Sequence, residues 1–149
     1  MRKLGDDGTL YGVLDSLGQN ALDQDDLELA KRCWTECSSI ALKLDDGIAG
    51  ANSLDGMAKI AVKQGDFEKG LRLHSVAAHL RREAGHTPHP GDQQFVAASV
   101  AAARQALDAR HADAIWEEGG RLNFVEAINY AIAEEHSGAA TTAHSSSLT

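Results

Sequence analysis

The histidines and cysteines of this sequence are the first residues to consider for chemistry, because both are common metal ligands. The run Glu83-Ala84-Gly85-His86 has the Glu-x-x-His spacing of di-iron helical bundles. Those sites need a second such motif and two further glutamates, whereas this sequence holds one motif, interrupted by a helix-ending glycine. Cys33, Cys37 and His74 could provide three zinc ligands. However, His74 falls at the packing position that Trp34 occupies 40 residues earlier. We therefore predict no bound metal.

Groups for covalent or acid–base catalysis do not converge in the sequence either. Neither a Gly-x-Ser-x-Gly turn nor a G-x-x-x-x-G-K-[ST] phosphate loop is present. Cys33 and Cys37 share a helical stripe at a spacing that puts their Cβ atoms ~5–6 Å apart, which is too far for a disulfide, so we expect reduced core thiols. The carboxylate pairs Glu117-Glu118 and Glu134-Glu135 are adjacent and point apart on a helix. The sequence predicts a protein that is not an enzyme and uses no cofactor.

The composition is that of a folded, soluble chain of 149 residues, 43% hydrophobic and 24% charged. This length points to a single domain. A formal net charge of −8 repels phosphate backbones and anionic membrane surfaces, which argues against a nucleic-acid partner. Apolar runs are far shorter than the ~20 residues that span a bilayer, and residues 1–7 lack a secretory apolar core. We expect a cytoplasmic protein that neither binds nor crosses membranes.

A repeat with an offset of 40 residues organises the first half of the chain. Leu14-Asp15 matches Leu54-Asp55, and Asp26-Leu27-Glu28 matches Asp66-Phe67-Glu68. In each unit, apolar residues recur at helical spacing on both sides of an acidic or Gly-Asp break, which is typical of a helical hairpin. No segment alternates as a strand does, so the chain is predicted to be all-α. We expect one core to contain Trp34, Leu54, Met57 and Phe67.

A second repeated element precedes each hairpin. Lys3-Leu4-Gly5-Asp6-Asp7-Gly8 matches Lys43-Leu44-Asp45-Asp46-Gly47, which is shorter by one residue. We interpret residues 1–8 as the remnant of a connector between repeats, which leaves the first hairpin without a capping neighbour. Its first helix is then expected to expose apolar surface and to favour self-association or docking onto another helical repeat. The residues expected on that surface are Leu10, Val13, Leu14 and Leu17.

The first hairpin resembles the tetratricopeptide repeat. Leu17-Gly18 on the first helix is followed by the small residue Ala30 and the aromatic Trp34 on the second, as in that family. The small residues let the two helices approach closely, and Trp34 fills the space toward the next unit. The second unit carries a weaker form of the pattern, and the period exceeds the family's ~34 residues, which implies longer helices. The resemblance implies a right-handed solenoid of helical hairpins.

The stretch 53–135 resembles the C-terminal end of the helical-repeat region in large bacterial signalling ATPases and LuxR-type transcriptional regulators. The resemblance rests on five motifs in order, namely Lys63-Gln64-Gly65-Asp66-Phe67, Gly85-His86-Thr87-Pro88-His89-Pro90, Ala101-Ala102-Ala103-Arg104, Ile115-Trp116-Glu117-Glu118-Gly119 and Leu122-Asn123-Phe124-Val125-Glu126-Ala127-Ile128. The nucleotide-binding and DNA-binding modules of those proteins have no counterpart in this sequence. The resemblance therefore implies only their scaffold role in signal transduction and transcription regulation.

Turn and capping residues divide the rest of the chain. Gly65 is placed to end one helix in a left-handed conformation, and Asp66, Asp108 and Asn123 are placed to cap the helices that follow them. A long helix over 92–107 is expected to bury Phe95, Val96, Val100, Ala103 and Leu107. The predicted segments are a connector remnant (1–8), two tetratricopeptide-like hairpins (9–84), a Pro/Gly loop (85–91), a C-terminal helical cap (92–135) and a disordered tail (136–149).

In stacked helical hairpins the first helices line the concave side, where solenoids bind partners. The polar positions predicted to line this groove are Asp15, Gln19, Asp23, Asn52, Asp55, Lys59 and Lys63. We interpret the chain as a non-catalytic protein-protein interaction or scaffold module with a protein or peptide partner. The alternative is a detached fragment of such a regulator without independent activity, and a third hypothesis is a small metal-binding helical bundle. An upstream reading frame for a nucleotide-binding domain would favour the fragment.

Overall fold

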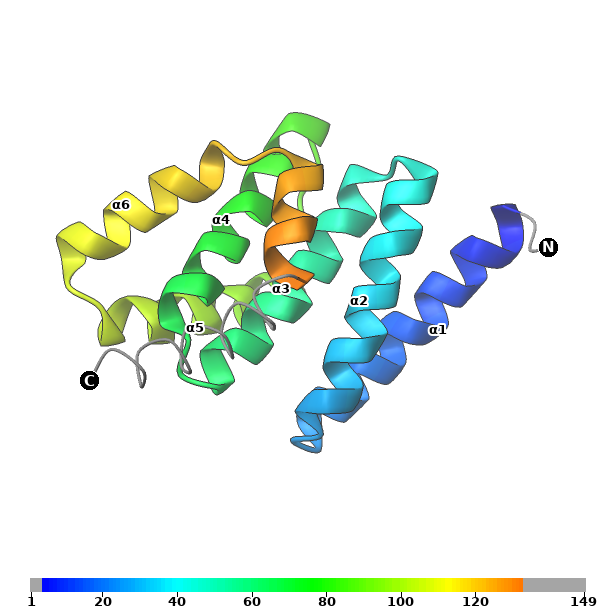
Figure 1. Cartoon of the computed structure of the whole chain (residues 1–149), viewed down its shortest axis with the longest axis horizontal. Helices are drawn as coiled ribbons and strands as arrows, with labels where there is room; N and C mark the ends of the chain where they lie inside the picture. Colours follow the sequence, from blue (N-terminus) through cyan, green and yellow to red (C-terminus); the bar gives the residue numbers. More distant parts are fainter. Residues whose placement is uncertain (1–3, 133–149) are drawn as a thin grey trace, which may run out of the picture.

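The computed structural model describes residues 4–132, and every regular element in that range is a helix (Figure 1). The labelled helices are α1 (Leu4–Asp23), α2 (Leu27–Leu44), α3 (Gly47–Lys63), α4 (Phe67–Ala84), α5 (Pro90–Ala106) and α6 (Ala109–Gly120). A seventh helical stretch covers residues 124–132. The all-α prediction is confirmed for this part of the chain. The predicted tail (136–149) and the first three residues of the predicted connector lie outside the described residues.

Capping side chains set where the helices begin, as the sequence predicts. Asp26, Asp66 and Asp108 precede α2, α4 and α6, and each accepts a hydrogen bond from the backbone N–H three residues further on. Asn123 and Glu126 exchange two such bonds, of 2.9 and 2.8 Å, at the start of the 124–132 stretch. This reciprocal pair is a capping box, which satisfies two backbone donors that the first helical turn leaves unpaired.

The turns between helices confirm one prediction and correct another. Gly65 follows α3 with a left-handed backbone (φ 84°), as expected. Residues 4–8, however, are helical rather than a connector. In the matching turn, Asp45 is left-handed and its N–H bonds to carbonyl groups at the end of α2, while Asp46 caps α3. Residues 4–8 instead form the first turns of α1, with two acidic side chains where the helix dipole favours negative charge.

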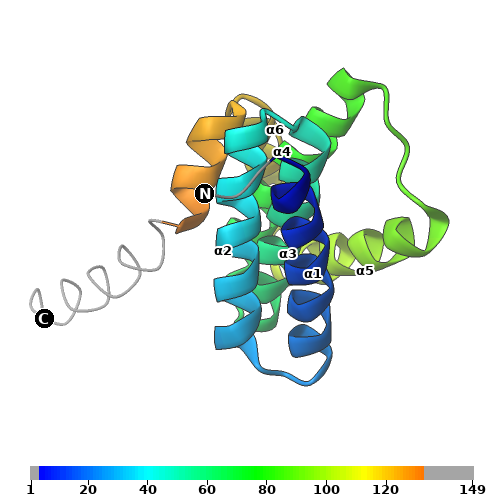
Figure 2. The same ribbon diagram turned by 90° about the vertical axis from the view of Figure 1, so that its right-hand side faces the viewer.

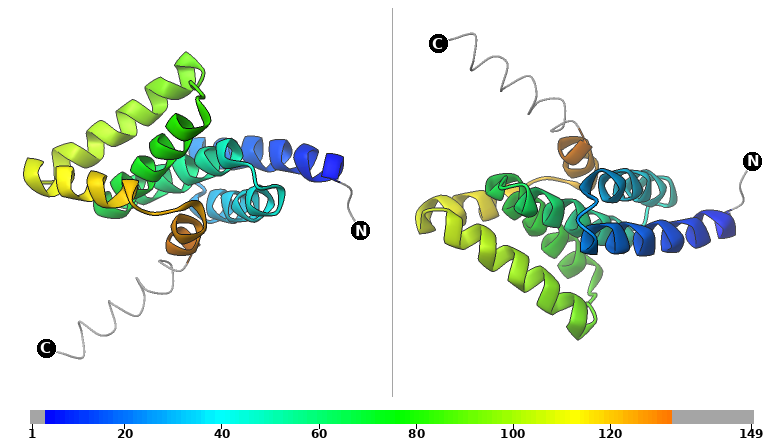
Figure 3. Two further views of the ribbon diagram at one scale, coloured as in Figure 1. Left: turned by 90° about the horizontal axis from the view of Figure 1, so that it is seen from above. Right: turned by 90° about the horizontal axis from the view of Figure 1, so that it is seen from below.

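Successive helices pack into two hairpins and a divergent third pair. α1 lies against α2, α2 against α3, and α3 against α4. α5 and α6 both pack on α4, and α5 also contacts α3, but the two helices diverge from their common turn (Figure 3). The region predicted as a C-terminal helical cap (92–135) therefore contains α5 and α6, which both pack on α4, and the helical stretch 124–132.

The apolar core has two parts rather than one. Trp34, Leu54 and Met57 share the larger cluster, as predicted, and the helical stretch 124–132 packs against it through Ala127 and Ile128. Phe67 does not belong to this cluster. It packs instead with Leu71, Ala103, Ala112 and Ile115 where α4 meets α5 and α6. The prediction for Phe67 was wrong because its side chain follows the face of α4 that carries Leu71, one helical turn further on.

Exposed apolar side chains occur on both outer helices. On α1, Val13 is 58% exposed and Leu17 is 42% exposed, as predicted, while Leu10 and Leu14 are half-buried. Self-association through this face stays a prediction. On α5, Ala103 is buried as expected, but Phe95 is 60% exposed, so the prediction that it points inward was wrong. The cause is the angle of α5, which brings only one edge of the helix onto α3 and α4. None of the helices within the described range has the length and apolarity to cross a membrane.

Candidate functional site

Two adjoining hollows run along α1, α3 and α5, and together they include every predicted groove residue. The first has a volume of about 90 Å³ and the second about 270 Å³. Asp15, Gln19, Asn52, Asp55 and Lys59 line the first hollow. Gln19, Asp23, Lys59 and Lys63 line the second. The structure therefore brings the seven predicted residues to one side of the hairpins, which we call the α1–α3–α5 groove.

The seven residues differ in how far a partner could reach them. Asp23, Asn52 and Lys63 are exposed, and Asp15, Gln19 and Lys59 are half-buried. Asp55 is only 3% exposed and lies at the floor of the groove. Its carboxylate is occupied by contacts within the chain, so it acts as a structural residue rather than a contact for a partner.

Each hairpin joins a carboxylate on its first helix to a ring on its second helix. In the first hairpin, the indole Nε1–H of Trp34 donates to Oδ1 of Asp15 at 3.0 Å. In the second, Nδ1 of His74 lies 2.6 Å from Oδ1 of Asp55. Both pairs are 19 residues apart in the chain and are related by the repeat offset of 40. The sequence repeat is therefore also a repeat of polar contacts.

The second of these pairs is the centre of a larger buried network. Arg81 forms an ion pair with Oδ2 of Asp55 and donates to the side-chain oxygen of Asn52 at 2.7 Å. Nε2 of His74 lies 2.8 Å from the hydroxyl oxygen of Ser99 on α5. A buried charge is tolerated only when it is paired and hydrogen-bonded. In this network the charges of Asp55 and Arg81 are paired, while Nε of Arg81 has no hydrogen-bond partner among the described residues, and the contacts tie α3, α4 and α5 together.

Asp55, His74 and Ser99 are connected in the order of a hydrolytic Asp–His–Ser triad. Such a site also needs preorganised donors for the oxyanion, most often free backbone N–H groups. Ser99 lies in the interior of α5, where the backbone N–H groups are taken up by helical hydrogen bonds. These three side chains therefore form a hydrogen-bonded tie between α3, α4 and α5.

α5 forms the third wall of the groove, which sequence reasoning missed. Asp92, Val96, Phe95 and Ser99 all line the hollows, and the ammonium group of Lys59 lies 5.4 Å from the centre of the Phe95 ring. The sequence motifs instead predict this helix as part of a C-terminal helical cap. One signal could have revealed its role. A ring residue follows the capping aspartate by eight positions in α2, α4 and α6, so α6 matches the second helices of the hairpins and α5 takes the place of a first helix. The three rings are Trp34, His74 and Trp116.

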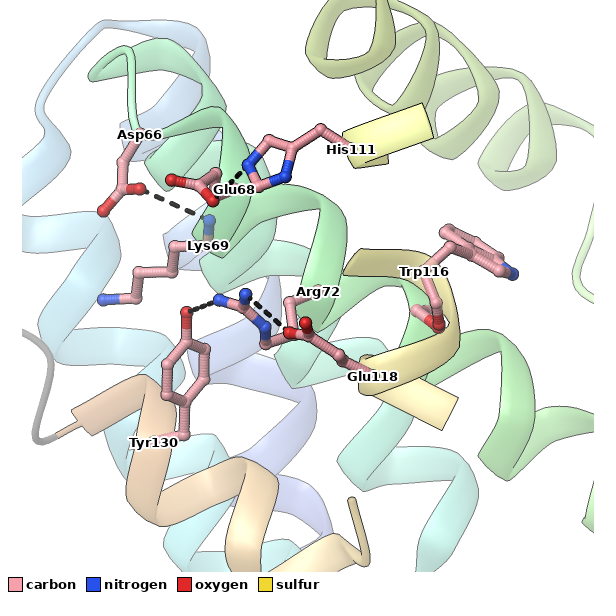
Figure 4. Close-up of polar contacts among 9 residues, drawn as sticks. Asp66, Glu68, Lys69, Arg72, His111, Trp116, Glu118 and Tyr130 are labelled. Carbon is pink, nitrogen blue, oxygen red and sulfur yellow. Dashed lines mark hydrogen bonds and ion pairs between the residues drawn. The ribbon is translucent and has the colours of Figure 1, made fainter. Parts of the chain in front are cut away.

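A separate polar cluster joins α4 to α6 and to the 124–132 stretch (Figure 4). The guanidinium group of Arg72 donates to the hydroxyl of Tyr130 at 2.7 Å and to the carboxylate of Glu118 at 3.0 Å. Glu68 lies 2.6 Å from the imidazole of His111 at the start of α6. These contacts join α4 to elements that the groove does not include, so their role is to position α6 and the final helical stretch.

The cysteines are buried, free thiols within α2, in agreement with the sequence. Burial raises the pKa of Cys37 to about 12, and the nearby Asp15 carboxylate adds to the increase. A thiol in this state is a poor metal ligand and nucleophile. His74, the third zinc candidate, is held between Asp55 and Ser99. Over residues 4–132, no three or more His, Cys, Asp or Glu side chains are grouped to hold a metal ion.

Comparisons with known proteins point to transcription regulators. Three proteins named "Putative HTH-type transcriptional regulator", one from Mycobacterium bovis and two from strains of Mycobacterium tuberculosis, are each 32% identical to this chain over 119 residues. The match covers 80% of this chain and 13% of each relative, so the chain spans about an eighth of their length. No family model matches the sequence, and no solved structure matches the fold.

Proposed function

We propose that this chain is a tetratricopeptide-like segment of an HTH-type transcriptional regulator and that it acts as a protein-interaction scaffold. The observation that carries the proposal is the 32% identity to the mycobacterial regulators over 80% of the chain. This similarity favours a regulator segment over a free-standing scaffold. Its place of action would then be the cytoplasm, where transcription is controlled.

The repeated contacts support the tetratricopeptide-like part of the proposal. Gly18 and Gly56 let the ring of Trp34 fit between α1 and α3, which matches the role of small residues in that repeat. The first helices contact one another in order, α1 with α3 and α3 with α5, and the second helix α4 contacts α6, which is the order expected in a solenoid of hairpins. A right-handed superhelix is the arrangement expected of this class.

The α1–α3–α5 groove is the surface we propose for a protein or peptide partner. It combines the exposed ring of Phe95 with two lysines and three aspartates that a partner can reach, Asp15, Asp23 and Asp92, which offers an apolar anchor and charges of both signs. Interfaces are enriched in aromatic anchors surrounded by polar groups. The net charge of −8 argues against DNA as the partner of this segment.

A segment exchange tests the regulator assignment. The homologous 119-residue stretch of the M. tuberculosis relative is replaced by this chain, and the transcripts that change on expression are compared for the native protein, the chimera and a deletion of the stretch. We expect the chimera, but not the deletion, to reproduce the native set. Reversal of groove charge in the chimera (Lys59→Glu with Lys63→Glu) should abolish the response, while Arg110→Glu on α6 should not. A stably folded chimera that behaves like the deletion would contradict the proposal.

The non-catalytic part of the proposal has its own test, because Asp55, His74 and Ser99 lie in triad order. We expect no labelling of Ser99 by a fluorophosphonate probe and no hydrolysis of p-nitrophenyl butyrate above the rate of a Ser99→Ala variant. Labelling that is lost in Ser99→Ala but kept in Ser53→Ala would show that an oxyanion site forms in solution and would contradict this assignment.

A further inference from the structure

A ring-bearing second helix covers one face of α3. The hydroxyl oxygen of Ser38 on α2 lies 3.0 Å from that of Ser53 and 3.7 Å from the sulfur of Met57. Between these two contacts, the ring of Trp34 lies over Gly56. We call such a surface a receiving face. It consists of the residue under the ring, the residue three positions before it and the residue directly after it.

α5 has a receiving face that α4 covers. Here the ring is the imidazole of His74, whose Nε2 lies 2.8 Å from the hydroxyl oxygen of Ser99. The flanking residues of this face are Val96 and Val100, and both are half-buried. Val100 packs against the apolar cluster to which Leu71 of α4 belongs. The receiving face of α5 is therefore a valine, a serine and a second valine.

α1 has the same three positions, but no described helix covers them. The repeat offset of 40 relates Ser16 to Gly56, so the receiving face of α1 is Val13, Ser16 and Leu17. All three residues are exposed, Val13 to 58% and Leu17 to 42%. α1 lies at one end of the molecule in Figure 1 and in front of α3 in Figure 2. A valine, a serine and a large aliphatic residue recur here in the order seen on α5.

The serine of this face indicates which ring fits it. A Cβ atom at Gly56 would lie only 2.4 Å from the indole that covers it, so a serine excludes an indole from the same place. An imidazole is smaller, and His74 lies within hydrogen-bonding distance of the hydroxyl of Ser99. Ser16 therefore fits a helix that carries histidine at its ring position, as α4 does.

The charges of α1 also favour a helix of the α4 type. α1 has Asp6 and Asp7 in its first turn and no lysine or arginine along its length. The last turn of α4 carries Arg81 and Arg82, and this end lies beside the N-terminal half of α5. A similar helix on α1 would bring its cations close to the acidic start of α1, whereas two α1 helices side by side would bring together like charges.

A second copy of this chain does not offer the required helix. α2 already lies against α1 and α3, and α4 already lies against α3 and α5. The remaining second helix, α6, carries the indole of Trp116 at its ring position rather than an imidazole. The occupant must therefore come from another hairpin.

We propose that the receiving face of α1 docks the second helix of a further hairpin, which precedes α1 in the longer regulator and carries histidine at its ring position. The imidazole would hydrogen-bond to Oγ of Ser16, and apolar side chains of the same helix would cover Val13 and Leu17. The mycobacterial relatives have the length for such a hairpin, because this chain spans about an eighth of them. The inference rests on the proposed function for the source of that hairpin.

A tandem chain tests the face, with residues 1–90 followed by residues 8–149. It sets His74 of the first copy 25 residues before Ser16 of the second copy, which is the distance from His74 to Ser99. Leu17→Cys is introduced in one copy at a time, and mass spectrometry follows its reaction with N-ethylmaleimide. We expect the second copy to react at least about tenfold more slowly than the first, because labelling then requires the docked helix to open. Equal rates in the two copies would overturn the proposal.

Further variants separate a specific seat for histidine from general burial. Ser16→Leu in the second copy fills the space of the imidazole and should raise the labelling rate of Leu17→Cys in that copy at least about fivefold. The same substitution in the first copy is the control and should leave this rate unchanged. A second tandem, residues 1–46 followed by residues 7–149, sets Trp34 over Ser16 and should protect less. Equal protection in the two tandems, or no effect of Ser16→Leu, would overturn the proposal.

Self-association, the other use of this face, is tested on the native chain. We expect the same monomeric sedimentation at micromolar concentration for the native chain and for Leu17→Asp. A dimer that Leu17→Asp dissociates would show that a second copy covers α1 and would overturn the proposal. The tandem does not involve the regulator, so slow labelling with a failed segment exchange would contradict the proposed function and support the docking face. Fast labelling with a successful exchange would overturn the docking face alone.

Discussion

In both hairpins a ring on the second helix meets a carboxylate on the first helix at equivalent positions, but the two rings face different residues on the helix that follows. In the first, the large indole of Trp34 lies over Gly56, the tenth residue of the following helix α3. In the second, the smaller imidazole of His74 meets Ser99, the tenth residue of the following helix α5. The size of the ring and the residue it faces are therefore matched, with indole on glycine and imidazole on serine.

This difference shows how one repeat can be stabilised in two ways. The first interface is held by apolar volume, because a Cβ atom on Gly56 would lie only 2.4 Å from the Trp34 ring. The second is held by a buried polar network that extends through Arg81 to Asn52. An apolar contact depends on shape, whereas a buried ionic network depends on every member being present. The two hairpins should respond differently to the same kind of substitution.

The largest effect is expected from Trp34→Ala. The side chain is buried in the larger core cluster, so its removal leaves a cavity and should lower the free energy of unfolding by about 3–5 kcal/mol. Urea denaturation followed by circular dichroism measures the change. Trp116→Ala, at the equivalent but half-buried position of α6, is the control and should cost clearly less. Equal costs at the two positions would contradict the comparison.

The next largest effects on the free energy of unfolding are expected from the carboxylates Asp55 and Asp15, and the two should differ from each other. Asp55→Ala leaves Arg81 and His74 without their partner and should cost about 3 kcal/mol, as expected when one member of a buried ion pair is removed. Asp15→Ala removes a single hydrogen bond from the Trp34 indole to a half-buried carboxylate and should cost about 1.5 kcal/mol. Chemical denaturation of both variants tests this order. A larger loss for Asp15→Ala would mean that the polar network does not stabilise the second hairpin.

The glycines under Trp34 provide a finer test. Gly56→Ala would place a Cβ atom 2.4 Å from the fused ring system, so the overpacking should cost about 2 kcal/mol despite the better helix propensity of alanine. Gly18→Ala approaches the same ring at 3.1 Å, where the gain in propensity of about 1 kcal/mol should offset the strain. Thermal denaturation should therefore separate the two variants. Similar melting temperatures for both would indicate that the ring shifts freely.

The smallest effect concerns alkaline pH and again separates the hairpins, because Cys37 in the first corresponds to Ala77 in the second. Burial raises the pKa of Cys37 to about 12 in the folded chain, from 9.0 when exposed. The folded state therefore holds its proton more tightly, and stability is lost as pH rises from about 9 toward 12. At pH 10 this loss should be about 1.4 kcal/mol.

The matched variant for that prediction is Cys37→Ala. The decrease in unfolding free energy from pH 7 to pH 10 should be about 1.4 kcal/mol smaller for this variant than for the native chain. An identical pH dependence for the two proteins would show that the thiol is not shielded.

Much of the local architecture follows from residues near one another in the chain. The capping aspartates, the left-handed Gly65 and the period of the apolar residues predict the helices and the two hairpins correctly. The repeat offset also places the seven groove residues on one side, since Asp15 and Asp55 occupy equivalent positions. These features are local because a cap, a turn or a helical face depends on residues within about one or two turns.

The sequence by itself therefore determined the helical class, the capped starts of α2, α4 and α6 and the shared side of the seven groove residues. Only the tertiary structure decided that α5 forms the third wall of the groove and that Phe67 joins a second apolar cluster. It also decided that Ser99 completes the chain of hydrogen bonds from Asp55 through His74. Each of these depends on the angle between helices that are distant in sequence. That angle comes from the packing of many side chains at once, such as the fit of Trp34 on Gly56. No single residue or spacing in the sequence encodes it.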